Sequence, residues 1–121
     1  IVMNKFDLEQ RTENLGVEIV VFCREINKNH ELRRISDQLI RSGTSIGANY
    51  REANGAASGK DFRNKIYICK KETKESIYWL KVIEKSSSDF AVKANRLCGE
   101  CDELERIFGK ITTSLATKKG A

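Results

Sequence analysis

Lysines and tyrosines recur at helical spacing between residues 67 and 85, in a pattern typical of a nucleic-acid-binding surface. Steps of four, three, four, three and four separate Tyr67, Lys71, Lys74, Tyr78, Lys81 and Lys85. This spacing places all six on one face of an α-helix. Ammonium groups on such a face would neutralise phosphates, and the rings between them would contact bases or sugars. The alternative is a solvated helix face without a ligand. Arg51, earlier in the chain, is a further candidate for nucleic-acid contact.

Metal chemistry is the second possibility that the residue types raise. The chain has four cysteines, and Cys98 and Cys101 have the C-x-x-C spacing found in zinc sites. A structural zinc site needs four ligands, however, and Cys101 occupies an apolar position of a helical repeat. We therefore expect all four cysteines to be reduced packing residues that bind no metal.

Catalysis has little support in the sequence. His30 is the only histidine, and nothing in the pattern places a nucleophile beside it. Four carboxylates could crowd one side of two helices and hold Mg²⁺ for a nuclease: Glu52, Asp61, Glu72 and Glu75. Ion pairs with nearby arginines and lysines are the alternative, and we favour it. We expect no enzyme and no cofactor.

The elements that position these residues are predicted to be four helices. Apolar residues recur with helical period over about residues 7–28, 31–57, 60–85 and 88–117, and the chain contains no proline. The breaks between these segments are short, which is typical of antiparallel neighbours. The 121 residues suffice for one hydrophobic core. We therefore predict a single all-α domain over residues 1–121, an up-down-up-down four-helix bundle.

Small and polar residues are concentrated in the second predicted helix. Gly43 and Gly47 lie one turn apart, so a neighbouring helix could approach closely there. Asn49 falls in a heptad core series, where a buried amide needs hydrogen-bond partners. Ser45 or the carboxylate of Glu52 could supply them. This pattern predicts a buried polar network that fixes the register of the helices.

The stretch SIGANYREANGAASGKDFRNKIYICKKETKESIYWL resembles the signature of a bacterial family of four-helix-bundle proteins. Members are encoded in intervening sequences of 23S ribosomal RNA genes. The matching positions are Ser45, Asn49, Glu52, Ser58, Asp61, Phe62 and Glu75. The family is similar to the accessory variability proteins of diversity-generating retroelements. This resemblance implies a homo-oligomer, in some relatives a pentamer, and binding of RNA or DNA, but no catalysis.

Apolar residues outside the predicted core stripes indicate a surface for self-association. The third predicted helix carries Ile68, Trp79 and Val82 on a further face, and the first carries Val17 and Val21. An isolated bundle would leave these side chains exposed, and such residues are commonest where another subunit docks. Scattered surface hydrophobes are the alternative.

Charge and hydropathy define the class of protein. There are 22 lysines and arginines against 17 aspartates and glutamates, a net charge of +5, which makes polyanions plausible partners. No segment has the apolar length of a signal peptide or a membrane span, so we expect a cytoplasmic protein without membrane contact. Our leading hypothesis is a non-enzymatic homo-oligomer that binds RNA or DNA. The alternative is a protein-interaction scaffold that binds no nucleic acid.

Overall fold

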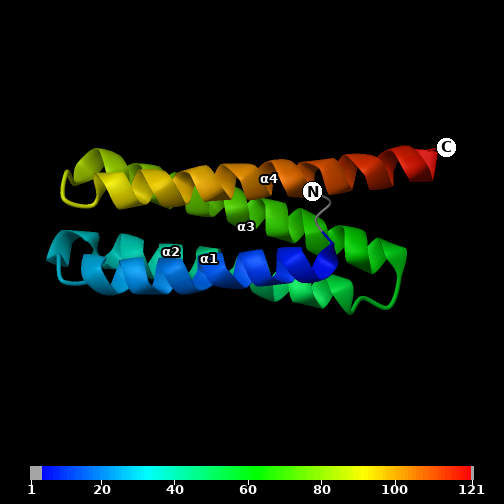
Figure 1. The fold of residues 1–121 in the computed structure, drawn as a ribbon, viewed down its shortest axis with the longest axis horizontal. Helices are drawn as coiled ribbons and strands as arrows, with labels where there is room; N and C mark the ends of the chain where they lie inside the picture. The colour runs from blue at the N-terminus through cyan, green and yellow to red at the C-terminus, as the bar shows by residue number, and fades with distance from the viewer. Residues whose placement is uncertain (1–3, 121) are drawn as a thin grey trace.

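Four long antiparallel helices make up the protein. The computed structural model describes residues 4–120 and contains no strand among them. The helices are α1 (Lys5–Ile26), α2 (Arg33–Asn54), α3 (Gly59–Ser86) and α4 (Ala91–Gly120), with a short 3₁₀ turn η1 (His30–Leu32) before α2. The α1–α2 and α3–α4 connections lie at one end of the bundle and the α2–α3 connection at the other (Figure 1). The predicted all-α, up-down-up-down four-helix bundle is confirmed.

Helix ends differ from the predicted limits because short polar side chains cap the backbone. α1 begins at Lys5 rather than at residue 7, since the Asn4 side chain accepts hydrogen bonds from the N–H groups of Phe6 and Asp7. The Asp7 carboxylate accepts in return from the Asn4 N–H, which completes a capping box. α1 ends at Ile26 rather than at residue 28.

The connections before α2, α3 and α4 also shift the limits. Residues 31 and 32, predicted to open the second helix, belong instead to the 3₁₀ turn, and the helix ends at Asn54 rather than at residue 57. The cap of α3 is Ser58, whose hydroxyl accepts from the Asp61 N–H at 3.1 Å. α4 begins at Ala91 rather than at residue 88 and extends to Gly120.

All four helices contribute to one hydrophobic core. Its largest fully buried side chains include Ile19 on α1, Leu39 and Ile46 on α2, Leu80 on α3, and Phe108 on α4. The rings of Tyr50 and Phe108 lie 6.0 Å apart between α2 and α4. Because each helix buries one apolar stripe, the opposite faces remain available for binding.

Glycines bring α1 and α2 close together. A Cβ atom added at Gly43 would clash with the fully buried Ile19 side chain, and one at Gly47 would lie 3.2 Å from the hydroxyl oxygen of Thr12. On α1, a Cβ at Gly16 would lie 3.9 Å from the Cα of Thr44. The close approach predicted at Gly43 and Gly47 is confirmed, and the neighbouring helix is α1.

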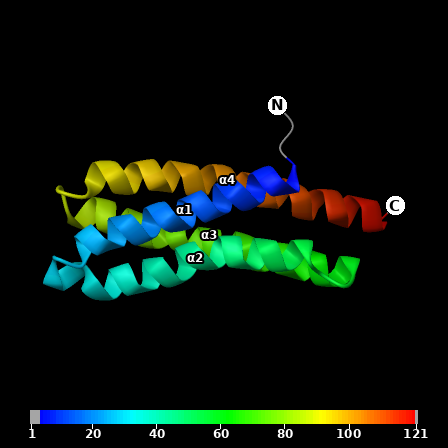
Figure 2. The ribbon, with the colours of Figure 1, turned by 60° about the horizontal axis from the view of Figure 1, so that its bottom comes forward.

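Ion pairs join α1 to α4, which run alongside each other in Figure 2. The Arg11 guanidinium binds both carboxylate oxygens of Glu100 at 2.7 Å and contacts Glu103 at 2.9 Å. The hydrogen bond to Glu100 raises the pKa of Arg11 above its ordinary value. Arg96 pairs with Glu18 at 3.1 Å further along. This seam is therefore polar and roughly charge-balanced at its surface.

Candidate functional site

The lysines and tyrosines predicted to share one face of α3 are all exposed. Lys71, Lys74, Lys81 and Lys85 lie at the surface, and the side chains of Tyr67 and Tyr78 are 48% and 59% exposed. Helical geometry produces this arrangement because core residues such as Ile66, Thr73 and Leu80 occupy the opposite side of α3.

A basic groove runs between α3 and α4, and part of it was not predicted from the sequence. Its volume is about 640 Å³, and its charged lining consists of Lys70, Lys74, Glu105, Arg106 and Lys110. The remaining lining residues are Gly109, Thr113 and Ser114. Four cations thus face one carboxylate. Oriented cations in a concave surface concentrate positive potential more than cations on a convex helix do.

Two lysines extend from α3 across this basic groove. The Lys74 ammonium lies 3.6 Å from the Glu105 carboxylate on α4. A Cβ atom at Gly109 would lie 3.8 Å from the Lys70 ammonium, so Lys70 lies directly over the α4 backbone. The half-buried stem of Lys70 holds its charge in the groove rather than out in solvent.

Tyr67 stands beside the basic groove. A smaller depression of about 280 Å³ is lined by Tyr67, Lys70, Lys71 and Lys74. It shares Lys70 and Lys74 with the groove, so the ring of Tyr67 and the cations of α3 and α4 line one continuous surface.

The other candidates for nucleic-acid contact lie elsewhere. Tyr78 is eleven residues beyond Tyr67, about 16 Å along α3, and its ring packs edge-to-face on Trp79 with centroids 5.0 Å apart. Lys81 and Lys85 lie further along the same helix. Arg51 pairs with Glu13 of α1 at 2.9 Å, on the α1–α2 side of the bundle.

The motif residues Ser45, Asn49 and Glu52 line one edge of α2 and do not form the predicted buried network. Asn49 is half-buried, and its amide donates to the Ser45 carbonyl oxygen at 2.9 Å. The Ser45 hydroxyl donates to the Arg41 carbonyl at 2.6 Å, and exposed Glu52 lies 3.8 Å from the Lys65 ammonium. These three residues flank the buried row of Leu39, Ile46 and Ala53 and therefore lie at the edge of the core.

The buried polar contact between α2 and α3 is made by two other residues. The hydroxyl oxygens of Ser42 and Ser76 lie 2.8 Å apart, and both side chains are fully buried. A hydrogen bond in this apolar setting favours one alignment of the two helices over others. The register-fixing role predicted for Asn49 therefore belongs to this serine pair.

Glu75 connects three parts of the α2–α3 surface. Its carboxylate pairs with Arg41 of α2 and accepts a hydrogen bond from the Trp79 indole N–H at 3.0 Å. Arg41 also pairs with the largely buried Glu72 at 3.2 Å. The Trp79 ring packs against the core, so our expectation that an isolated bundle leaves Trp79 exposed is wrong.

The four carboxylates considered for Mg²⁺ do not converge. Glu52 lies near Lys65, Glu72 and Glu75 pair with Arg41, and Asp61 occupies the first turn of α3. Within residues 4–120 there is no cluster of three or more His, Cys, Asp or Glu side chains that could hold a metal ion.

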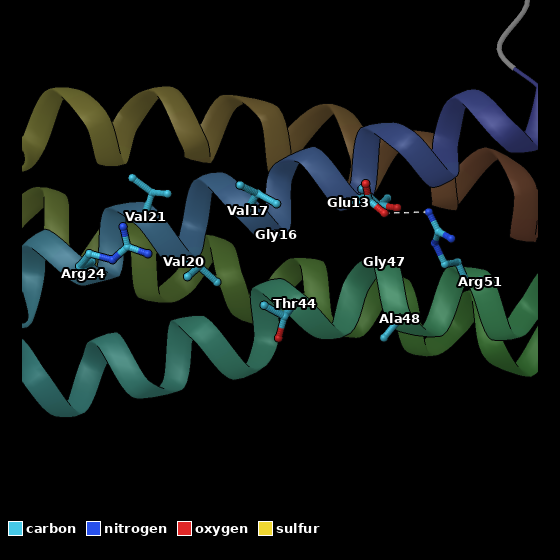
Figure 3. A pocket seen from close by; sticks show the side chains of 11 residues that line it. Glu13, Gly16, Val17, Val20, Val21, Arg24, Thr44, Gly47, Ala48 and Arg51 are labelled. Atoms are coloured by element: carbon cyan, nitrogen blue, oxygen red, sulfur yellow. Dashed lines mark hydrogen bonds and ion pairs between the residues drawn. The ribbon is translucent and has the colours of Figure 1, made fainter.

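An apolar groove lies between α1 and α2 on another side of the bundle (Figure 3). Its volume is about 430 Å³, and Val17 and Val21, 59% and 47% exposed, form its α1 wall. The Glu13–Arg51 ion pair crosses one end. Ile68, Trp79 and Val82 lie on α3 and do not line this groove, so the predicted interface residues do not form one surface.

All four cysteines are buried, and none of them forms a disulfide bond. Burial raises the pKa of Cys69 and of Cys101 to about 12, and it also raises the pKa of Cys23 and Cys98. The Cys69 thiol donates to the Ile46 carbonyl oxygen at 3.6 Å. Neutral, packed thiols are poor nucleophiles and poor metal ligands, because both roles require the thiolate.

Comparisons with known proteins agree with this architecture. Residues 4–110 match the model of a family described as 23S rRNA-intervening sequence protein. A crystal structure of a protein of unknown function from the S23 ribosomal protein family of Bacteroides thetaiotaomicron VPI-5482 superposes with a TM-score of 0.80 at 31% identity. The alignment covers 86% of this chain and 96% of that one. No curated protein matches the chain. Among the described residues, no helix is both long and apolar enough to cross a membrane.

Proposed function

Because the chain belongs to the family of 23S rRNA-intervening sequence proteins, we propose that it is a non-enzymatic homo-oligomer that binds RNA or DNA. The observation that carries this proposal is the basic groove between α3 and α4. Four cations and one carboxylate line it, and the exposed ring of Tyr67 stands beside it. A cytoplasmic location, where RNA and DNA are accessible in a bacterium, is part of the same proposal.

The uneven distribution of charge supports a specific anionic partner over general solubility. The α1–α4 depression contains two arginines and three glutamates, and its arginines are paired. The basic groove, in contrast, has four cations and only one carboxylate. Such local excess attracts a polyanion and gives salt-dependent binding.

Self-association is supported by apolar side chains outside the core on two sides of the bundle. Val17 and Val21 line the α1–α2 groove, whereas Ile68 and Val82 belong to α3. In a ring, one surface of each subunit binds a different surface of the next subunit. The α1–α2 groove of each subunit would then receive a second copy of the chain. The family resemblance favours five subunits. A ring would repeat the basic groove, and several weak contacts to one polymer would then act together.

The absence of catalysis is supported by how the carboxylates are used. Glu72 and Glu75 share Arg41, and the Arg41–Glu72 contact has a largely buried carboxylate. Carboxylates that neutralise cations in this way keep helices together and leave no spare ligands for a metal.

Binding can be tested by fluorescence anisotropy with labelled single-stranded and duplex RNA and DNA of mixed sequence. We expect affinity with little sequence dependence that falls steeply with salt, and its loss in Lys71→Glu plus Lys74→Glu. Arg33→Glu plus Arg34→Glu makes the same change in net charge at the far end of α2 and is the matched control. If both double variants bind as tightly as the wild type, the site lies elsewhere.

The alternative, a protein-interaction scaffold, draws its support from the apolar α1–α2 groove. That groove would then receive a helix of another protein rather than a second copy of this chain. If the wild-type protein binds no nucleic acid at low salt, the scaffold becomes the better explanation.

A further inference from the structure

We propose that the basic groove between α3 and α4 holds a single strand, with one unpaired base stacked on Tyr67 and the neighbouring phosphates on cations of both helices. This inference rests on the proposed nucleic-acid binding and specifies its site and strand type. It adds residues of α4, Arg106 and Lys110, to a surface that the sequence pattern confined to α3.

The position of Tyr67 favours an unpaired base. Its ring is half-exposed and lines a depression with Lys70, Lys71 and Lys74. A ring at the wall of such a depression can stack on a base, while the ammonium groups within one turn of it reach the flanking phosphates. Bases inside a duplex already stack on their neighbours, so this contact is open only to a single strand.

The α4 wall supplies the continuation of the path. The groove extends along α4 from Glu105 to Ser114, nine residues or about 14 Å of helix. Arg106 and Lys110 lie one turn apart along it, with the exposed hydroxyl groups of Thr113 and Ser114 beyond them. Guanidinium, ammonium and hydroxyl groups are the side chains that most often contact phosphate oxygens.

One carboxylate in the groove opposes binding. Glu105 lies 3.6 Å from the Lys74 ammonium, so an incoming phosphate must compete with it for that lysine. Removing this negative charge should free Lys74 and increase affinity.

The chain provides a matched control for Tyr67. Tyr78 lies on the same helix and is at least as exposed, yet it lies about 16 Å away and its ring packs on Trp79. Tyr78 is outside both the groove and its adjoining depression. Two tyrosines of equal chemistry thus differ in their distance from the proposed path and in the packing of one of them on Trp79.

The first experiment compares both tyrosine variants on a 12-nucleotide single-stranded RNA and on the duplex of the same sequence. We expect Tyr67→Ala to weaken single-strand binding by about 5- to 150-fold and Tyr67→Phe to retain it, because stacking needs only the ring. Tyr78→Ala should change single-strand affinity by less than about twofold, and neither alanine variant should alter duplex binding. Circular dichroism would verify that each variant is folded.

The second experiment measures the salt dependence of single-strand binding. Each phosphate contact contributes about 0.7 to the slope of log affinity against log salt, so Arg106→Gln plus Lys110→Gln should reduce it by about 1.4. Lys81→Gln plus Lys85→Gln, outside the groove, should leave the slope unchanged. Glu105→Gln should raise affinity.

Three results would overturn the inference in distinguishable ways. If the wild type binds but the Tyr67 and Arg106/Lys110 variants match it, the site lies elsewhere and the proposed function survives. A wild-type preference for duplex would contradict the single-strand assignment alone. No binding of either strand type at low salt would overturn both the inference and the proposed function.

Discussion

The hydroxyl groups of Ser42 on α2 and Ser76 on α3 lie 2.8 Å apart inside the apolar core. Each hydroxyl also contacts a carbonyl of its own helix, Ser76 that of Glu72 at 3.0 Å and Ser42 that of Leu39 at 3.4 Å. Since each hydroxyl carries one hydrogen, one serine donates to the other, and the second donates to the carbonyl of its own helix. Sliding α2 along α3 would separate these groups and leave polar atoms in an apolar core.

A double-mutant cycle should detect this coupling. We expect Ser42→Ala and Ser76→Ala each to lower the free energy of unfolding by about 1 kcal/mol, and the double variant to lose less than their sum by about 0.5–1.5 kcal/mol. Urea unfolding followed by circular dichroism measures all four states. Ser45→Ala, which removes a half-exposed hydroxyl, should cost less than about 0.5 kcal/mol. Additive effects of Ser42 and Ser76 would show that the two hydroxyls act independently.

The close packing of α1 on α2 predicts that two Gly→Ala substitutions have opposite effects on stability. Gly43→Ala should destabilise the protein by about 1–2 kcal/mol, because the new methyl group overlaps buried Ile19 and outweighs the gain in helix propensity. Gly99→Ala on α4 should stabilise it by about 0.5–1 kcal/mol, since a Cβ there meets nothing within 4 Å. Thermal unfolding of the two variants is the measurement. A stabilised Gly43→Ala would contradict the observed packing.

The heptad pattern predicted the fold because it depends on local periodicity, but it did not show which neighbouring row of α2 completes the buried stripe. In the series of Ile35, Ser42, Asn49 and Ala56, only Ser42 is fully buried. The neighbouring series of Ser36, Gly43 and Tyr50 takes its place in the core. The row of Leu32, Leu39, Ile46 and Ala53 is buried throughout, so the packing of α1 and α3 against α2, rather than the seven-residue repeat, decides which flanking row joins it in the core.

The ion pairs of Arg41 and Arg51 should differ in their contribution to stability. Arg41→Ala leaves the largely buried Glu72 without its cation and should cost about 1–3 kcal/mol. Arg51→Ala breaks a pair whose two side chains are each 53% exposed, and its cost should stay below about 1 kcal/mol. Chemical denaturation compares the two. Adding Glu72→Gln to Arg41→Ala should recover part of the lost free energy of unfolding, because the buried charge is removed. If it does not, the loss comes from the other contacts of Arg41.

The buried cysteines predict a loss of stability in alkaline solution. Burial raises the pKa of Cys69 and Cys101 from 9.0 to about 12, so the folded protein keeps protons that the unfolded chain releases above pH 9. These thiols leave the free energy of unfolding unchanged below pH 9. Between pH 9 and 12 each should lower it by about 1.4 kcal/mol per pH unit.

Urea denaturation at pH 8, 9 and 10 tests this effect when the wild type is compared with Cys69→Ala. The cavity left by the alanine lowers stability equally at every pH. Above pH 9, the stability of the variant should fall less steeply than that of the wild type, and the two slopes should differ by about 1.4 kcal/mol per pH unit. Equal slopes in the two proteins would mean that Cys69 ionises in the folded state as readily as in the unfolded chain.

The basic groove shows where reasoning from sequence ends. The spacing of lysines along α3 was visible in the sequence, because a helix face depends on one segment alone. Arg106 and Lys110 are also one turn apart in the sequence, but nothing there indicates that they face Lys70 and Lys74. Their alignment depends on the rotation and register of α4 against α3, which are set by packing across the whole core.

Self-association should depend on the apolar groove between α1 and α2. We expect Val17→Asp plus Val21→Asp to convert the oligomer to a monomer in light scattering while helicity is kept, since both side chains are largely exposed. Val92→Asp on α4, 86% exposed and outside the groove, is the matched control. Trp79→Ala is a poorer probe because Trp79 packs against the core. A monomeric wild type at micromolar concentration would contradict assembly, and an oligomer that survives the double change would move the interface to another surface, such as that of Ile68 and Val82.

The same monomeric variant separates assembly from nucleic-acid binding. Each basic groove lies within one chain, so a 12-nucleotide RNA should bind the variant and the wild type with similar affinity. A longer RNA that reaches several grooves of one ring should bind the variant at least 100-fold more weakly, because multivalency is lost. Equal binding of the long RNA to both proteins would show that one groove accounts for the affinity, and that assembly serves a different purpose.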